Sequence, residues 1–269
     1  MTGPVLDFAS RSDRGKVRPR NEDSVVVHAD AGVVIIADGI GGASSGDVAS
    51  RMATEIIGQR FLRQLPSRVR PRRAQLLAEA AVDEANGAII NHAKNQARCA
   101  GMGTTVVVGY FGCTWLAYAH VGDSRLYRLR ARQLVQLTSD HSFIQEVVDQ
   151  GFFPDLDEAR RYGINDNVLT RAVGSTSHVV APTAVTDLAV GDIYLFCTDG
   201  LTGMVPDDEL RLVLSAVQGS LGIAADALVH LACDNGGADN ITLALVRVKS
   251  LGDDAGEEDE HSEDVSGED

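Results

Sequence analysis

The chain has 269 residues, of which 44% are hydrophobic and 23% charged, and this composition is ordinary for a soluble globular protein. Ten of its 38 acidic residues lie in the last 17 positions, which hold no Lys or Arg. The rest of the chain therefore has 28 acidic and 24 basic residues. This balance argues against a protein that mainly binds a nucleic-acid backbone, and no apolar run approaches the roughly 20 residues of a membrane span.

The first 16 residues lack the apolar stretch of a secretory signal, so we expect a cytoplasmic protein with neither nucleic acid nor membrane as a partner. The cysteines lie far apart and form no C-x-x-C pair, which indicates reduced thiols rather than a zinc site or a disulfide framework. They are Cys99, Cys113, Cys197 and Cys233.

Short runs rich in β-branched residues predict the strands, and the predicted helices fall between groups of them. The strands are expected over 24–29, 32–38, 104–111, 115–123, 125–130, 133–138, 192–199 and 241–248. The helices are expected over 46–64, 71–97, 206–217 and 220–234. Because the two kinds of element do not alternate one by one, the order favours packed sheets with helices outside over a doubly wound parallel sheet.

The helical spacing also predicts which side chains face the core. In the first helix these are Val48, Met52, Ile56 and Phe61, and in the second they are Leu76, Leu77, Ala80 and Ala81. The two-residue turn at 131–132 and the three-residue turn at 112–114 predict antiparallel neighbours.

We expect a single domain over residues 1–250 and an acidic, disordered tail over 251–269, which has too little apolar surface to offset the entropy of ordering. Two interpretations of the tail remain open. It is either a solubilising appendage or a docking segment for a basic partner or for the arginine-rich stretch of this same chain. That stretch contains Arg63, Arg68, Arg70, Arg72 and Arg73.

Aspartates stand at the ends of five predicted strands. They are Asp23, Asp38, Asp123, Asp199 and Asp239. A buried carboxylate costs several kcal/mol unless it is paired or binds a cation, and few lysines lie nearby. An all-oxygen set without His or Cys favours Mg²⁺ or Mn²⁺ over zinc or copper. Any one of these sites taken alone is better explained as a turn, so only their recurrence, together with the surrounding motifs, predicts a metal site.

An ordered series of motifs resembles the bacterial metal-dependent protein serine/threonine phosphatases of the PPM (protein phosphatase 2C) type. The matching segments are 12–24 (SDRGKVRPRNEDS), 37–50 (ADGIGGASSGDVAS), 102–105, 120–127, 137–142, 167–174, 197–205 and 238–242. The resemblance covers about residues 6–248. It implies an α+β fold, a four-layer αββα sandwich in which two packed antiparallel sheets are flanked by pairs of helices.

The resemblance also implies a centre with two Mn²⁺ or Mg²⁺ ions. Asp38 would bridge the two ions and the carbonyl of Gly39 would bind one of them, while Asp199 and Asp239 would complete the other.

Three further acids have implied places around this centre. Glu22 and Asp23 would hold metal-bound waters or lie in the outer coordination sphere. Asp123 would share with Asp199 a third, weaker ion that bacterial members often show. Arg125, two residues after Asp123, is expected to pair with a carboxylate.

No motif for a covalent serine or cysteine mechanism is present, so a water shared by two metal ions is the implied nucleophile toward phosphoserine or phosphothreonine. Arg18 would bind the substrate phosphate. His141 is a candidate catalytic residue that would donate a proton to the leaving alkoxide. Two alternatives for that proton remain open, because His141 could be structural and a metal-bound water could be the acid.

The resemblance implies a monomeric enzyme that acts on phosphorylated proteins and reverses a Hanks-type serine/threonine kinase. An anti-sigma or STAS-type partner is the narrower alternative. A catalytically silent module of the same fold, which binds phosphoproteins or regulates another protein, is the alternative from a different class. The sequence does not distinguish Mn²⁺ from Mg²⁺.

Overall fold

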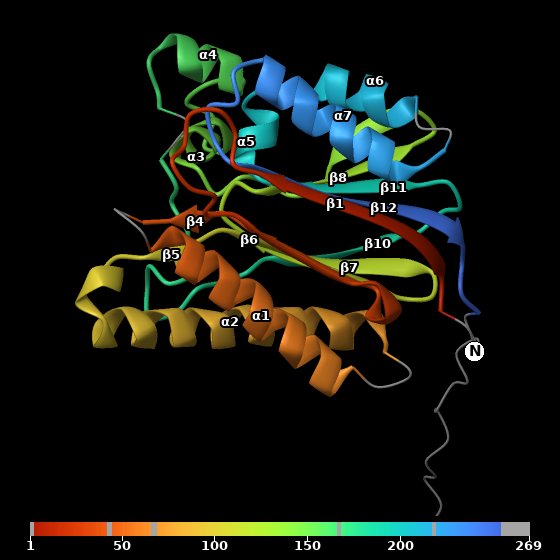
Figure 1. The fold of residues 1–269 in the computed structure, drawn as a ribbon, viewed down its shortest axis with the longest axis horizontal. Helices are drawn as coiled ribbons and strands as arrows, with labels where there is room; N and C mark the ends of the chain where they lie inside the picture. The colour runs from red at the N-terminus through yellow and green to blue at the C-terminus, as the bar shows by residue number, and fades with distance from the viewer. Residues whose placement is uncertain (1–2, 42–44, 66–68, 166–167, 217–218, 254–269) are drawn as a thin grey trace, which may run out of the picture.

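Two five-stranded antiparallel sheets lie face to face in the computed structural model, and helices cover the outer side of each sheet (Figure 1). The structure describes residues 3–41, 45–65, 69–165, 168–216 and 219–253. The order of layers, from helices through two sheets to helices, confirms the predicted α+β sandwich. Among the described residues, no helix combines the length and apolar character that a membrane crossing requires.

The first sheet has the strand order β10-β7-β6-β3-β2 and carries two long helices on its outer face. Its strands are β2 (Ser24–His28), β3 (Val33–Ala37), β6 (Val106–Phe111), β7 (Trp115–Val121) and β10 (Thr183–Asp187). The helices are α1 (Gly46–Gln64) and α2 (Pro71–Asn95). Both helices were predicted, and α2 ends two residues earlier than expected.

The second sheet has the strand order β1-β12-β11-β8-β9 and is covered by two shorter helices. Its strands are β1 (Val5–Asp13), β8 (Arg125–Arg130), β9 (Gln133–Gln136), β11 (Ile193–Cys197) and β12 (Ile241–Ser250). The helices are α6 (Asp207–Ser215) and α7 (Leu221–Asp234). The last strand ends at the predicted domain boundary. Residues 254–269 lie outside the described residues, so the predicted disorder of the tail stays a prediction.

Several short elements gather at one end of the sandwich, at the left of Figure 1. They are β4 (Gly39–Ile40), β5 (Gly103–Thr104), α3 (Phe143–Asp149), α4 (Leu156–Arg161) and α5 (Asp199–Thr202). Two 3₁₀ turns, η1 (Ala29–Ala31) and η2 (Ala97–Cys99), complete the described elements.

The core has three main layers, one between the two sheets and one between each sheet and its helices. Val34 and Ile36 of β3 point between the sheets, while Val33 and Ile35 point toward the helices. Alternate residues of a strand face opposite sides of its sheet, and here both sides are covered. This is why β3 is apolar throughout.

The buried face of α1 differs by one position from the prediction. Ala49, Ala53 and Ile57 are fully buried against the sheet together with Phe61. The predicted core residues Val48, Met52 and Ile56 are only partly buried. Small alanine side chains let the helix approach the sheet closely, and the larger residues beside them fill the flanks. The helical spacing alone did not distinguish the residues that contact the sheet from the larger residues beside them.

Candidate active site

Five strand ends bring their aspartates to the same end of the sandwich. Asp38 follows β3, Asp123 follows β7 and Asp199 follows β11. Asp23 precedes β2 and Asp239 precedes β12. Because neighbouring strands run in opposite directions, residues after some strands meet residues before others at one edge. The structure therefore gathers the acids that the sequence singled out.

The electrostatics of this cluster show carboxylates that are close together and poorly neutralised. Burial raises the pKa of Asp38 well above its ordinary value, and the charges of Asp23 and Asp199 raise it further. Burial also raises the pKa of Asp199, whose carboxyl group shares a hydrogen bond with Asp38. Burial and repulsion by Asp199 raise the pKa of Asp23 and of Asp123 to about 7. Without a cation these acids therefore hold protons that isolated aspartates would lose.

Two carboxylate oxygens in the cluster lack a hydrogen bond with any described residue. They are the buried Oδ1 atoms of Asp23 and Asp199. The other oxygen of Asp23 accepts a hydrogen bond of 2.9 Å from the Thr198 hydroxyl. A buried carboxylate oxygen without a partner is costly, and a hard divalent cation satisfies such oxygens. The donor set thus fits Mg²⁺ or Mn²⁺.

In the described part of the chain, no three acidic, histidine or cysteine side chains are arranged so that they could hold a metal ion as they stand. The position of Arg18 contributes to this, because its Nη2 lies 2.6 Å from Oδ2 of Asp239. The charges of Asp38 and Asp199 also raise the pKa of Arg18, after the larger effect of Asp239. This guanidinium is thus the nearest positive charge to the cluster that the structure shows.

Glycines allow Glu22 and the carbonyl of Gly39 to lie against the start of α1. A Cβ atom at Gly46 would lie 2.4 Å from Oε2 of Glu22 and 2.6 Å from the oxygen of Gly39. A Cβ atom at Gly39 would lie 2.2 Å from the oxygen of Gly46. Burial, and then the charge of Asp47, raise the pKa of Glu22. Any side chain at position 46 would displace these oxygen atoms.

Asn240 is a functional candidate that the sequence analysis did not single out. Its side-chain amide donates to the carbonyls of Arg14 (2.9 Å) and Arg20 (2.8 Å), and its Oδ1 accepts from the N–H of Glu22 (2.8 Å). Asn240 therefore holds the loop that carries Arg18. The only feature of the sequence that pointed to Asn240 was its place in the matching segment 238–242 (ADNIT).

The surroundings of His141 favour the structural alternative for this residue. Its Nδ1 accepts a hydrogen bond of 3.1 Å from the N–H of Gly122, and its Nε2 lies 3.4 Å from Nη1 of Arg171. Its ring stacks on His120 at 4.6 Å between centroids. Burial, His120 and Arg171 together lower the pKa of His141 to about 3. A neutral imidazole in this position holds the loop before Asp123.

Arg125 forms the ion pair expected of it. Its Nε and Nη2 donate to Asp140 at 2.9 and 2.6 Å, and its Nη1 donates to the hydroxyl of Tyr127. This pair lines a cavity of about 140 Å³ that also borders Asp123 and Asp199. Residues of α3 and α4 also line it. Two members of the acidic cluster, Asp123 and Asp199, therefore border a cavity beside these two helices.

Comparison with known proteins identifies the family. A family profile described as Protein phosphatase 2C matches residues 13–218. The chain is 35% identical to the serine/threonine phosphatase stp of Listeria monocytogenes over 239 residues, covering 88% of this chain and 93% of that protein. It is 37% identical to the serine/threonine protein phosphatase PstP of Mycobacterium tuberculosis over 247 residues, which are 91% of this chain and 45% of PstP.

Solved structures give the same result. A crystal structure of the Mycobacterium tuberculosis phosphatase PstP/Ppp matches with a TM-score of 0.82 at 33% identity, covering 91% of this chain and 99% of that chain. The PstP catalytic domain in complex with two manganese ions matches with a TM-score of 0.79 at 33% identity, covering 91% and 98%. The chain therefore belongs to the protein phosphatase 2C family.

Proposed function

We propose that this chain is a divalent-metal-dependent enzyme that hydrolyses phosphoserine and phosphothreonine in proteins. The observation that supports it most directly is the buried group of strand-end aspartates, which has unpaired oxygens and a guanidinium beside it. The relatives named serine/threonine phosphatases support the reaction class.

The proposed metal ligands are Asp38, Asp199, Asp239 and the carbonyl of Gly39. We assign two ions, Mn²⁺ or Mg²⁺, to this set, and the relative solved with two manganese ions supports that number. When bound, such ions supply Lewis-acid charge and lower the pKa of water, so that water becomes a nucleophile near neutral pH.

Three more acids surround the proposed ligands. Glu22 and Asp23 are assigned to hold the water molecules of the ions, and Asp123 together with Asp199 is assigned to a third ion. Their support is the clustering of these carboxylates and the unpaired oxygen of Asp23.

The chain's own cations and hydrogen bonds perform the remaining steps. Arg18 binds the phosphate oxygens of the substrate and offsets the charge that builds up during transfer, because guanidinium donors match phosphate oxygens in pairs. It would be available for this role with Asp239 holding a metal ion instead of pairing with Arg18. Asn240 positions Arg18 through the loop that it holds. His141 acts as a positioning residue for the loop at Gly122.

The proposed substrates are proteins phosphorylated by a cognate serine/threonine kinase, and the enzyme is proposed to act as a monomer in the cytoplasm. These assignments rest on the resemblance to the bacterial serine/threonine phosphatases.

Hydrolysis of p-nitrophenyl phosphate and of a phosphothreonine peptide, with and without millimolar Mn²⁺, tests the proposal. Wild type should show metal-stimulated turnover, and Asp38→Asn should abolish it. Asp208→Asn is the matched control, because Asp208 is an exposed aspartate on α6. Phosphopeptide binding without turnover in wild type would instead support a silent binding module, and unchanged activity in Asp38→Asn would contradict the assigned site.

A further inference from the structure

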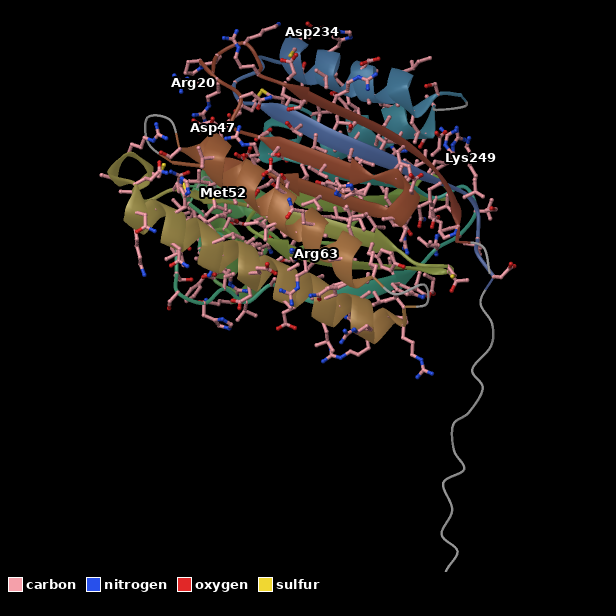
Figure 2. The ribbon with its side chains drawn as sticks, turned by 60° about the horizontal axis from the view of Figure 1, so that its bottom comes forward. Arg20, Asp47, Met52, Arg63, Asp234 and Lys249 are labelled. Atoms are coloured by element: carbon pink, nitrogen blue, oxygen red, sulfur yellow. The ribbon has the colours of Figure 1, made fainter. Side chains whose placement is uncertain are left out.

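Exposed arginines gather where α1 ends and α2 begins, at the end of the molecule opposite the acidic cluster. Figure 2 shows Arg63 near the last turn of α1. Arg70, Arg72 and Arg73 follow at the start of α2 and are also exposed. These four residues are called the arginine surface below. Arg63 lies 3.9 Å from Glu84, and the other three form no ion pair with a described residue.

The helix itself makes this concentration of positive charge unfavourable. Arg72 and Arg73 lie in the first turn of α2, and that turn contains no acidic residue. The N-terminal end of a helix carries a partial positive charge, which favours anions and disfavours cations there. Two arginines in the first turn therefore oppose the helix dipole as well as each other. An anionic group bound here would relieve both repulsions.

The chain leaves the fold beside this surface. The N–H of Gly252 donates a hydrogen bond of 2.8 Å to the carbonyl of Cys113, in the turn between β6 and β7. Trp115, at the start of β7, packs against Ala74 in the first turns of α2. The last described residues are thus connected through one hydrogen bond and one side-chain contact to the start of α2. Figure 1 shows the end of β12 and the start of α2 at the same end of the molecule.

The segment that follows has the opposite charge and sufficient length. Residues 254–269 contain nine acidic residues and no Lys or Arg. Sixteen residues reach about 50 Å when extended, and a flexible chain of that length has an average end-to-end distance of roughly 22 Å. Because the segment is tethered beside the arginine surface, its effective concentration there is high.

We propose that residues 254–269 bind in cis to the arginine surface formed by Arg63, Arg70, Arg72 and Arg73. The charges are complementary, and Gly252, near the end of the described residues, is hydrogen-bonded to the turn whose Trp115 packs on the start of α2. The surface is separated from the proposed catalytic centre by the length of α1, which is about 28 Å for 19 residues. The contact therefore does not involve the acidic cluster, and its test does not depend on the proposed function.

Cleavage by a glutamate-specific protease, followed by intact-mass spectrometry of the full-length chain, tests the contact. Bound glutamates are protected, so the tail of wild type should be removed roughly two- to tenfold more slowly than that of Arg72→Ala/Arg73→Ala at low salt. At about 0.5 M NaCl, where charges are strongly screened, the two rates should become equal. A synthetic peptide of residues 254–269 corrects for the effect of salt on the protease.

The matched control is Lys94→Ala/Arg98→Ala, which removes two exposed charges at the other end of α2 and gives the same net charge. Its tail should be cleaved as slowly as that of wild type. Circular dichroism and hydrolysis of p-nitrophenyl phosphate should be unchanged in both variants. If Arg72→Ala/Arg73→Ala does not fold, the contact is still tested by comparing the salt dependence of tail cleavage in wild type with that of the free peptide. Equal cleavage of wild type and both variants, or protection that grows with protein concentration and so indicates a second copy, would overturn the proposal.

Discussion

Strand β11 has an aspartate at each end, and the two have opposite surroundings. Asp192, which precedes the strand, is 1% exposed and accepts hydrogen bonds from Arg130 Nε (2.8 Å) and Nη2 (2.6 Å). The hydroxyl of Tyr194 and the N–H of Ala189 also donate to it. Asp199, after the strand, has an Oδ1 without a described partner and a raised pKa.

This difference separates a structural acid from one that we propose to be functional. The fold supplies an arginine where a carboxylate only has to be buried, as it also does for Asp140 with Arg125. Around Asp199 it supplies several further carboxylates instead, which is unfavourable by itself. The unfavourable energy is acceptable if a divalent cation binds there. Four predictions test this difference between Asp192 and Asp199 and the groups around them, from the largest expected effect to the smallest.

Substitution Asp199→Asn should have the largest effect on activity. We expect turnover of a phosphothreonine peptide to fall by about a thousandfold or more, because a proposed metal ligand is lost. In the presence of a chelator, the free energy of unfolding should stay constant or rise, because one repelling charge is removed. Urea unfolding with and without Mn²⁺ measures this. A clear loss of stability in the chelated protein would contradict the contrast with Asp192.

Substitution Asp192→Ala should have the reverse profile. It leaves Arg130 without its carboxylate and Tyr194 with only the carbonyl of Asp187 (3.3 Å) as acceptor, so we expect the free energy of unfolding to fall by about 2–3 kcal/mol. The partial exposure of Arg130, 36%, keeps this below the cost for a fully buried charge. The activity per folded molecule should be unchanged. Urea unfolding and active-site titration check the two parts, and a specific loss of turnover would show that Asp192 also serves the site.

The same contrast shows what the sequence could predict. Asp192 and Asp199 both stand beside an apolar strand, so the strand-end pattern applies to both. The partner that distinguishes them is Arg130, which lies on the neighbouring strand β8. Such a partner becomes visible only when strands are paired in their register. The gathering of the strand-end acids was predicted, whereas the pairing of Arg18 with Asp239 and the contacts of Asn240 required the structure.

The fold was predictable where burial leaves a strong pattern. Strands β3 and β11 are buried on both faces and are apolar throughout, so they were predicted. Strands β1 and β10 were missed. Both lie at the edge of a sheet and are only half-buried, so polar residues interrupt their apolar ones. Edge position alone is not the reason, because the edge strands β2 and β9 were predicted.

Substitution Arg18→Ala tests how the acidic cluster is neutralised without metal. We expect kcat/KM for a phosphopeptide to fall by about tenfold or more, because a phosphate contact is lost. Mn²⁺ should bind several-fold more tightly by calorimetry, because Asp239 no longer has to leave an ion pair. Arg14→Ala, in the same loop, is the control and should change neither quantity strongly. Weaker Mn²⁺ binding in Arg18→Ala would show that the ion pair instead prepares Asp239 for metal.

The smallest effect concerns a buried group that the fold keeps neutral. Burial is the main cause that lowers the pKa of His141, to about 3, and it also lowers the pKa of His120. Unfolded histidine has a pKa near 6.5, so below that pH the unfolded chain binds protons that the folded chain does not. The contribution of these histidines to the free energy of unfolding should therefore fall as the pH is lowered from about 6.5 toward 5, by up to about 1 kcal/mol per pH unit.

The raised pKa values of Asp23 and Asp123 act in the opposite direction, since the folded chain gains protons there below pH 7. Substituting His141 separates the contribution of its imidazole to the pH dependence of stability from the opposing contribution of the aspartates. Urea unfolding of His141→Asn should lose less stability between pH 7 and pH 5 than wild type does. The control His178→Asn removes an exposed histidine and should follow wild type. Identical pH dependence in wild type and His141→Asn would mean that this imidazole accepts a proton in the folded state, and the proton-donor alternative for His141 would then regain support.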